Sequence, residues 1–327
     1  MSAVDNRQND RRLVESSPAE ALGQSEAFLQ FQERLSRVAG VDRPVLILGE
    51  RGTGKEMAAS RLHYLSVRWD QPFVALNCAA LSPSLIESEL FGHEAGAFTG
   101  ARDKRIGKLE HAQGGTVFLD EIESMPLDLQ AKLLRVIETR SLERLGSNRQ
   151  VTLDVRFLAA SKADLARLSA SGGFREDLYY RLNVVTIEVP PLAARREDVP
   201  LLLHHLMRKA RARYHRDVPE LSPAALAALA ARDWPGNVRE LRNMADRLVL
   251  GVVDPAEIGA PLAGDGAGGE SLAEQVGAFE RNVIQHTLLS HGGRLKPTYE
   301  VLGVSRKTLY DKIRRHGLGK FADGENS

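Results

Sequence analysis

Apolar runs alternate with helix-like stretches between residues 21 and 190 of the chain. Five runs rich in aliphatic and aromatic residues predict buried strands, at 44–49, 72–77, 116–121, 155–161 and 184–190. Between them, apolar residues recur with a spacing of about 3.6 residues, as in "LDLQAKLLRVIE" (127–138), which is typical of helices. Because strands and helices alternate, the pattern predicts an α/β domain with a parallel sheet flanked by helices on both faces.

The pattern changes on either side of this region. The stretch "PPLAARRED" (190–198) marks a boundary, and the chain beyond it predicts a helical subdomain over 191–255. A Gly/Ala-rich segment predicts a flexible linker at 256–270, and a short helical module follows at 271–321. Residues 1–20 are polar and weakly periodic, which predicts a mobile N-terminal tail.

Composition narrows the class of protein. With 327 residues, 43% of them hydrophobic and 27% charged, the chain is an ordinary globular protein of two or three domains. The net charge of +1 argues against nucleic-acid binding by the whole chain, but residues 294–320 hold eight Lys and Arg against two Asp and Glu. Cys78 is the only cysteine, which excludes an intrachain disulfide. With no apolar segment of membrane-spanning length, these features indicate a cytoplasmic protein that does not contact a membrane.

The stretch "GERGTGKE" (49–56) predicts a nucleotide site, because it directly follows a predicted strand and begins a predicted helix. It matches Gly-x4-Gly-Lys, whose backbone N–H groups surround phosphates while Lys55 reaches the β- and γ-phosphates. Glu56 stands where Ser or Thr usually serves Mg²⁺. A chance glycine turn is the alternative, and the strand–loop–helix context disfavours it. The predicted nucleotide-binding residues of this loop are Gly49, Glu50, Arg51, Gly52, Thr53, Gly54, Lys55 and Glu56.

Acidic and basic side chains elsewhere suit the same chemistry. The run "TVFLDE" (116–121) ends in two carboxylates, which suits Mg²⁺ binding by Asp120 and activation of water by Glu121. An acidic turn after a strand is common, so the two carboxylates indicate a catalytic site only in combination with the glycine-rich loop. Arg175 and Arg181 in "FREDLYYRL" could neutralise charge on a γ-phosphate, also from a neighbouring subunit. Surface salt bridges are the alternative for both arginines at this point.

A second glycine-rich stretch, "GHEAGAFTGARDKR" (92–105), places Phe98 and Thr99 between Gly96 and Gly100. Glycines mark backbone that must bend, whereas Phe normally belongs in a core. The ordinary interpretation is a turn with one buried anchor residue.

Together these motifs resemble the AAA+ ATPase domain of bacterial enhancer-binding proteins, the activators of sigma-54 RNA polymerase, over roughly residues 21–255. "ELFGHEAGAFTGA" and "FREDLYYRL" are far more specific than the phosphate-binding loop, and in this family Glu also follows the loop lysine. The hexapeptide "GAFTGA" matches the loop that contacts sigma-54 in this family. By resemblance, the sigma-54 contacts are Gly96, Ala97, Phe98, Thr99, Gly100 and Ala101.

The resemblance implies roles for further residues. Asn77 would hold Glu121 away from water until the γ-phosphate of ATP is sensed. Arg175 and Arg181 would act on the nucleotide of a neighbouring subunit, and Arg239 in "WPGNVREL" would be the nucleotide sensor of a helical lid, 191–255. The stretch "AASKADL" places Lys162 where Asn often stands, which leaves the chemistry of that sensor open.

The resemblance also implies cofactors and partners. ATP and Mg²⁺ would be bound, and copies of the chain would form a homo-oligomer, a hexameric ring with a dimer at rest. Glycines would let the loop rise and fold back as the nucleotide changes, and Phe98 and Thr99 would form its tip. Six such tips in a ring would make a multivalent contact with the sigma-54 RNA polymerase holoenzyme.

The stretch "YEVLGVSRKTLYDKIRRHGL" (299–318) predicts a helix-turn-helix. Ser305 suits an N-cap, and Leu309 and Ile313 lie four residues apart on one helix face. A solvated basic helix is the alternative. The segment resembles the Fis-type DNA-binding module of the same activators, although Tyr299 stands where a small residue is usual and Pro297 predicts a late helix start. The predicted contacts to enhancer DNA are Ser305, Arg306, Lys307, Thr308, Tyr310, Lys312, Arg314 and Arg315.

The sequence therefore predicts an ATP-hydrolysing transcriptional activator that binds upstream enhancer DNA and converts sigma-54 closed promoter complexes to open ones. A DNA-binding regulator with a decayed ATPase is one alternative, against which the intact Lys55, Asp120 and Glu121 argue. Another AAA+ remodeller is the second, and it would have no reason to carry "GAFTGA". Residues 1–20 are too short for a receiver or sensing domain, so we expect control from another protein or from a part absent from this chain.

Overall fold

The computed structural model describes residues 21–98, 101–258, 277, 280–281, 283–285, 287–288 and 291–318. The predicted tail at 1–20, Thr99, Gly100 and most of the predicted linker at 256–270 lie outside the described residues. The chain divides into two compact units, 1–260 and 261–327, and each is described by itself.

The first unit is built on a five-stranded sheet with the strand order β2-β5-β8-β1-β9, in which every neighbouring pair is parallel. The strands are β2 (Phe73–Asn77), β5 (Thr116–Asp120), β8 (Arg156–Ser161), β1 (Val45–Leu48) and β9 (Val185–Glu188). Each of them lies within one of the five predicted apolar runs. The predicted α/β class with a parallel sheet is therefore confirmed.

Both faces of the sheet are covered, as the alternation of side chains along β5 shows. Val117 and Leu119 pack into one core with helices α3 (Pro83–Phe91), α5 (Leu127–Thr139) and α7 (Glu176–Leu182). Phe118, which points to the opposite face, packs with α1 (Glu26–Ala39) and α2 (Lys55–Tyr64). The short helices α4 (Lys108–His111), η3 (Ile122–Ser124) and α6 (Leu165–Ala170) complete this part.

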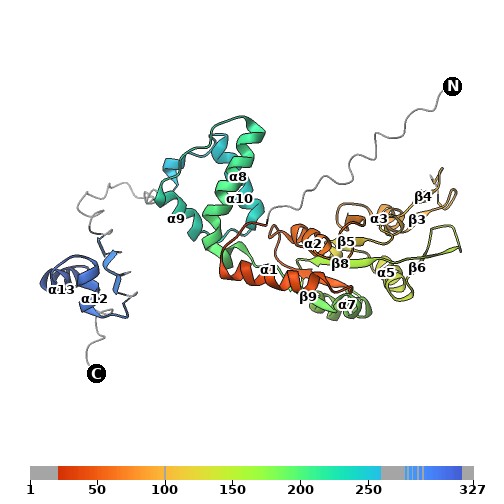
Figure 1. Cartoon of the computed structure of the whole chain (residues 1–327), viewed down its shortest axis with the longest axis horizontal. Coiled ribbons are helices and arrows are strands. Elements are labelled where there is room, and N and C mark those ends of the chain that lie inside the picture. Colours follow the sequence, from red (N-terminus) through yellow and green to blue (C-terminus); the bar gives the residue numbers. More distant parts are fainter. Residues whose placement is uncertain are drawn as a thin grey trace. The chain divides into compact units, whose positions relative to one another are not determined.

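Two β-hairpins extend from the same end of the α/β part (Figure 1). One pairs β3 (Gly92–His93) with β4 (Arg105–Ile106), and the other pairs β6 (Ser141–Glu143) with β7 (Gln150–Thr152). An isolated bridge between His93 and Leu145 joins the two hairpins. The "GAFTGA" stretch lies in the first hairpin, so a second hairpin supports its base.

The helical part follows β9 and has a core of its own. It consists of η4 (Leu192–Asp198), α8 (Val199–Tyr214), α9 (Pro223–Ala231), α10 (Asn237–Val249) and η5 (Pro255–Glu257). Trp234 is buried in this core and its indole N–H donates to the Leu229 carbonyl at 2.8 Å. Asp198 accepts hydrogen bonds from Ser25, which joins the helical part to the start of α1.

The second unit contains α12 (Leu295–Val301) and α13 (Arg306–Arg315), separated by a turn. The Ser305 hydroxyl accepts from the Thr308 N–H at 3.1 Å, which is the predicted N-cap. Leu309 and Ile313 are buried together, as their spacing predicted. Helix α12 begins two residues before Pro297, because a proline is tolerated in the first turn, where its missing N–H is not needed. Within the described residues, no helix is long and apolar enough to cross a membrane.

Candidate active site

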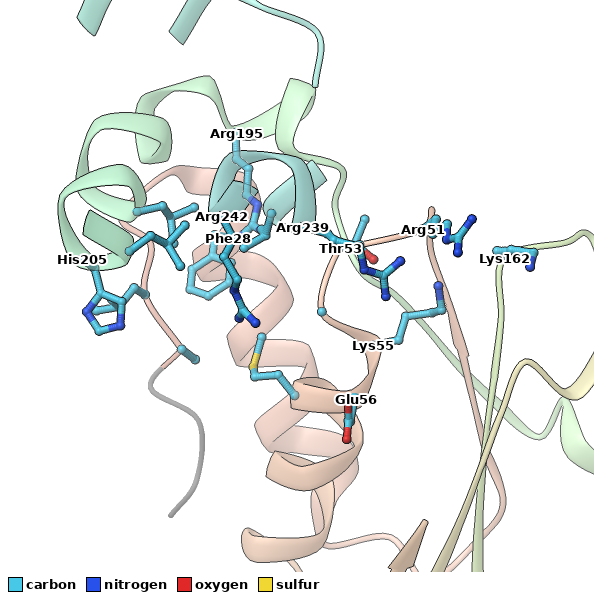
Figure 2. Close-up of a pocket in the computed structure, with 18 of the residues that line it drawn as sticks. Phe28, Arg51, Thr53, Lys55, Glu56, Lys162, Arg195, His205, Arg239 and Arg242 are labelled. Atoms are coloured by element: carbon cyan, nitrogen blue, oxygen red, sulfur yellow. The ribbon is translucent and has the colours of Figure 1, made fainter. Parts of the chain in front are cut away.

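A cavity of about 330 Å³ lies between the carboxyl edge of the sheet and the helical part. Ligands of open parallel sheets bind at this edge, outside the carboxyl ends of the strands. Figure 2 shows Arg51, Lys55 and Lys162 at one end of the pocket and His205 at the other. The predicted residues that line it are Arg51, Gly52, Thr53, Gly54, Lys55, Glu56, Asp120, Glu121 and Arg239.

The glycine-rich loop has the geometry of a phosphate-binding loop. Gly52 and Gly54 have φ angles of 80° and 105°, which side chains rarely allow, and α2 begins at Lys55. The Lys55 ammonium donates to the carbonyls of Gly49 and Glu50 at 2.8 and 3.0 Å, so these two residues position the lysine without lining the cavity. Burial lowers the pKa of Lys55, against the attraction of nearby carboxylates.

The carboxylates lie at the end of β5. Asp120 is aligned with Asn77 of β2, whose side-chain amide donates to the Asp120 carboxylate at 3.2 Å. Glu121 has a left-handed backbone with φ of 51°, a strained conformation for a residue other than glycine. Its carboxylate accepts from the Lys162 ammonium at 2.8 Å, and this bond lowers the pKa of Glu121. We expected Asn77 to hold Glu121; in this structure Asn77 binds Asp120 and Lys162 binds Glu121.

The donor atoms fit a magnesium ion that arrives with a nucleotide. Mg²⁺ usually binds one or two carboxylates together with phosphate oxygens and water, and the Asp120 carboxylate, which lines the cavity, would supply one such ligand. Among the described residues, no group of three His, Cys, Asp or Glu side chains could hold a metal ion.

The helical part supplies side chains to the same cavity. Arg239 and Arg242 lie three residues apart on α10, and His205 comes from α8. Arg195 lies over the ring of Phe28, with 5.0 Å between the guanidinium carbon and the ring centroid. Sequence reasoning missed all of these except Arg239. The spacing of Arg242 relative to Arg239 was a usable signal, since it places both on one helix face.

Asn237 is a further residue that sequence reasoning missed. Its buried side chain donates to the Glu50 carboxylate at 2.9 Å and to the Arg51 carbonyl at 3.1 Å. It also accepts from the backbone N–H of Leu192 at 2.6 Å. A Cβ atom at Gly52 would lie 2.3 Å from the Gly236 carbonyl oxygen, so the turn before α10 packs directly on the phosphate-binding loop.

Arg175 and Arg181 do not line this cavity. Both are exposed, and Arg175 forms an ion pair with Asp177 at 2.7 Å. Within one chain they lie away from the candidate nucleotide site. Their predicted action on a neighbouring subunit stays a prediction.

The first hairpin carries the predicted sigma-54 contacts. Gly96, with φ of 81°, donates its N–H to the Ala101 carbonyl at 2.8 Å, and Ala101 donates to the Phe98 carbonyl at 3.0 Å. The Phe98 side chain is 47% exposed, and the rings of Phe98 and His93 pack edge to face with 5.0 Å between their centroids. Phe98 is therefore not the buried anchor of the ordinary interpretation. Thr99 and Gly100 lie outside the described residues.

An ion-pair network joins the two hairpins. The Arg144 guanidinium in the second hairpin binds both oxygens of Glu110, at 2.7 and 2.6 Å, and Glu94 at 2.6 Å. Ala97 also packs on Gly146, where an added Cβ atom would lie 2.8 Å from the Ala97 Cβ. The bidentate geometry and the low exposure of Arg144, 11%, make this network a firm base for the "GAFTGA" turn.

The predicted DNA contacts lie on α13 and its cap. Lys312 forms an ion pair with Glu280, and His316 binds the same carboxylate at 2.9 Å. The Lys312 ammonium is therefore already paired with a carboxylate of its own unit, whereas the other predicted contacts are exposed to solvent. The exposed predicted contacts are Ser305, Arg306, Lys307, Thr308, Tyr310, Arg314 and Arg315.

A phosphate-binding loop on a parallel sheet, closed by a helical lid, defines the class of AAA+ P-loop ATPase domains. Residues 21–188 match the sigma-54 interaction domain, 193–260 the AAA+ ATPase lid domain, and 275–316 the bacterial regulatory protein, Fis family. The chain therefore belongs to the family of sigma-54-dependent transcriptional regulators, which confirms the resemblance.

Relatives span almost the whole chain. The C4-dicarboxylate transport transcriptional regulatory proteins DctD of Rhizobium meliloti and Pseudomonas aeruginosa are 49% and 50% identical over 299 and 306 residues, covering 91% and 93% of this chain. The chain spans 65% and 66% of the length of those relatives. The crystal structure of NtrX from Brucella abortus is 36% identical with a TM-score of 0.69, covering 91% of this chain and 69% of that one. NtrX has also been solved with ATP and with ADP, with TM-scores of 0.68.

Proposed function

We propose that this chain binds and hydrolyses ATP and uses the cycle to activate transcription by sigma-54 RNA polymerase from enhancer DNA. The observation that carries the proposal is the arrangement of Lys55, Asp120 and Glu121 around one cavity that the lid arginines also line. The complexes of NtrX with ATP and ADP support a nucleotide as the ligand.

In the proposed reaction, the loop N–H groups and Lys55 bind the β- and γ-phosphates. Mg²⁺, held by Asp120, would neutralise charge on these phosphates. Glu121 accepts a proton from water as the water oxygen attacks the γ-phosphorus. The bond from this phosphorus to the bridging oxygen breaks, and ADP and phosphate leave. A glutamate is ionised at neutral pH at its ordinary pKa, so the Glu121 carboxylate can accept that proton; the hydrogen bond from Lys162 lowers the pKa of Glu121 further.

Arg175, which precedes α7, and Arg181, within α7, fit an assembly of several subunits. Arg175 and Arg181 are exposed and away from the cavity of their own chain, which is the placement required for action on the nucleotide of a neighbour. We propose that they complete the site in a homo-oligomer, a hexameric ring that forms from resting dimers.

The hairpin and the helix-turn-helix would provide the two macromolecular contacts. Phe98 is exposed on a turn with a firm base, and six copies would contact sigma-54 together. The exposed basic residues at the start of α13, Arg306 and Lys307, would enter the major groove of enhancer DNA. Hydrolysis would move the hairpin and convert the closed promoter complex to the open one.

The proposal is tested with two variants of the cavity. Glu121→Gln should reduce the hydrolysis rate at least about 100-fold while ATP still binds, because it removes the general base and leaves the phosphate-binding loop intact. Lys55→Ala should weaken ATP binding itself. Phosphate release and nucleotide titration measure the two effects. Turnover of Glu121→Gln near that of the wild type would refute the assignment of the base.

A further inference from the structure

The end of helix α8 carries a dense positive charge that the proposed ATPase site does not use. Residues 208–216, "RKARARYHR", contain five Lys and Arg and no Asp or Glu. Helix α13, "RKTLYDKIRR", which carries most of the predicted DNA contacts, has the same number of Lys and Arg but also one Asp. The helical part of the first unit therefore contains a segment at least as basic as the helix predicted to bind DNA.

The basic side chains surround a groove on the surface of the helical part. The groove has a volume of about 390 Å³, and its lining residues are Arg208, Arg211, Ala212, His215, Arg216 and Asp217. The Arg216 guanidinium donates to the Leu250 carbonyl at 3.0 Å, at the end of α10. His215 has a left-handed backbone, φ 52°, which ends α8 beside the groove. The groove thus lies where α8 and α10 end, and Arg216 joins the two helix ends.

The arginines of this groove lack the partners that exposed arginines have elsewhere. Arg37 pairs with Glu33 at 3.1 Å, and Arg167 pairs with Asp164 at 3.3 Å. No ion pair of Arg208 is found among the residues that the structure describes. The nearest carboxylate to Arg211 is that of Asp217 at 3.8 Å, and Asp217 is fully exposed. An ion pair with this much solvent access contributes little, so both guanidinium groups can bind another anion.

The stability of α8 does not explain this arrangement. Arg208 and Arg211 lie three residues apart on one helix face, where like charges repel by a few tenths of a kcal/mol. The helix dipole favours the cations in the last turn, Arg211 and Arg213. It does not account for Arg208, which precedes that turn, or for Arg216, which lies beyond the helix. An anion bound in the groove would relieve the repulsion.

We propose that this groove binds the phosphate backbone of duplex DNA through Arg208, Arg211 and Arg216, without reading the base sequence. A duplex carries one negative charge per about 1.7 Å of its axis. The helix rises about 9 Å from Arg208 to its end at Tyr214, so the groove can face several phosphates. Guanidinium groups donate two parallel N–H bonds to phosphate oxygens. The choice of DNA among polyanions rests on the proposed function, in which the Fis-type unit brings DNA to this chain.

The test uses the full chain with Arg208→Gln and Arg211→Gln combined. Its affinity for a fluorescent duplex of arbitrary sequence is measured between about 50 and 200 mM salt. The slope of log affinity against log salt should become shallower by about two, since each phosphate contact contributes about 0.9. The affinity at about 0.1 M salt should fall more than tenfold. Arg208→Lys with Arg211→Lys should retain most of the slope, because counterion release depends on charge.

A matched control removes the same charge elsewhere. Arg37→Gln combined with Arg167→Gln deletes two exposed arginines that already pair with Glu33 and Asp164. It should leave the slope and the affinity unchanged. Because Gln and Arg have similar helix propensities and all four arginines are exposed, both double variants should keep the wild-type melting temperature. Both should also hydrolyse ATP at the wild-type rate without DNA.

The outcomes separate this proposal from the proposed function. An unchanged slope in Arg208→Gln with Arg211→Gln, or the same loss in the control, would overturn the proposal and leave the groove a solvated surface. If Lys307→Ala still weakened DNA binding in that case, DNA binding by the Fis-type unit would stand. A wild-type chain that bound no duplex would refute both. Loss of binding to phosphatidylglycerol vesicles with unchanged DNA binding would assign the groove to a membrane surface and overturn the proposal.

Discussion

Replacing Asn237 by Ala should detach the lid from the phosphate-binding loop. The substitution removes two hydrogen bonds donated to the loop, to the Glu50 carboxylate and the Arg51 carbonyl. It also leaves the buried N–H of Leu192 without its acceptor, which is 2.6 Å away in the wild type. The lid has its own hydrophobic core, so we expect it to stay folded while its position on the loop is lost.

The magnitude follows from these contacts. The unsatisfied N–H of Leu192 and the lost bond to a charged Glu50 together cost about 3 kcal/mol. The left-handed backbone of Asn237, φ 50°, adds about 1 kcal/mol, because Ala adopts it less readily than Asn. The sum of about 4 kcal/mol is a large part of the stability of an ordinary domain.

Two variants separate the backbone effect from the side-chain effect. Asn237→Gly relieves the backbone strain but still lacks the side chain, so it should be about 1 kcal/mol less destabilising than Asn237→Ala. Asn237→Asp retains the acceptor for Leu192 but places a carboxylate beside Glu50, so the contact to the loop should still be lost.

Urea denaturation measures the free energy of unfolding, and hydrogen exchange at Leu192 and Val238 measures opening of the lid. The Val238 N–H donates to the Gly52 carbonyl at 3.1 Å, so its protection reports on the same junction. ADP titration measures the effect on the cavity. An Asn237→Ala protein within 1 kcal/mol of the wild type, with unchanged ADP affinity, would refute the reasoning.

Three further predictions follow from the exposed surfaces. ATPase activity per subunit should rise with protein concentration, and mixing Arg181→Ala with Lys55→Ala subunits should restore some activity; activity independent of concentration without complementation would mean that Arg181 acts only within its own chain. Phe98→Ala should leave ATP hydrolysis largely intact but abolish open-complex formation. If the Phe98→Ala protein bound sigma-54 normally in the presence of an ATP transition-state analogue, the hairpin would not be the sigma-54 contact. Lys307→Ala should lower DNA affinity and reduce the salt dependence of binding by about one phosphate contact, and both losses should exceed those of Lys312→Ala, because Lys312 is paired with Glu280. Equal losses for the two variants, in DNA titrations at several salt concentrations, would contradict this.

The sequence alone determined the local and periodic features. The five strands were found because buried parallel strands appear as apolar runs, and the helices because their apolar residues repeat at one spacing. The phosphate-binding loop and the Ser305 cap were found because each depends on residues close together in the chain. Asp120 was placed beside the loop because both follow strands of one sheet.

Only the tertiary structure decided which distant groups meet. Asn237 contacts Glu50 across 187 positions, and Lys162 reaches Glu121 across 41. These contacts depend on the strand order and on the docking of the lid, which no local pattern encodes. The contacts of Asn77 depend on the same features: the register of β2 against β5 aligns Asn77 with Asp120, whereas Glu121, directly after β5, contacts Lys162. The chemical role open to each side chain could be predicted from the sequence, but which side chains contact one another is decided by the folded chain.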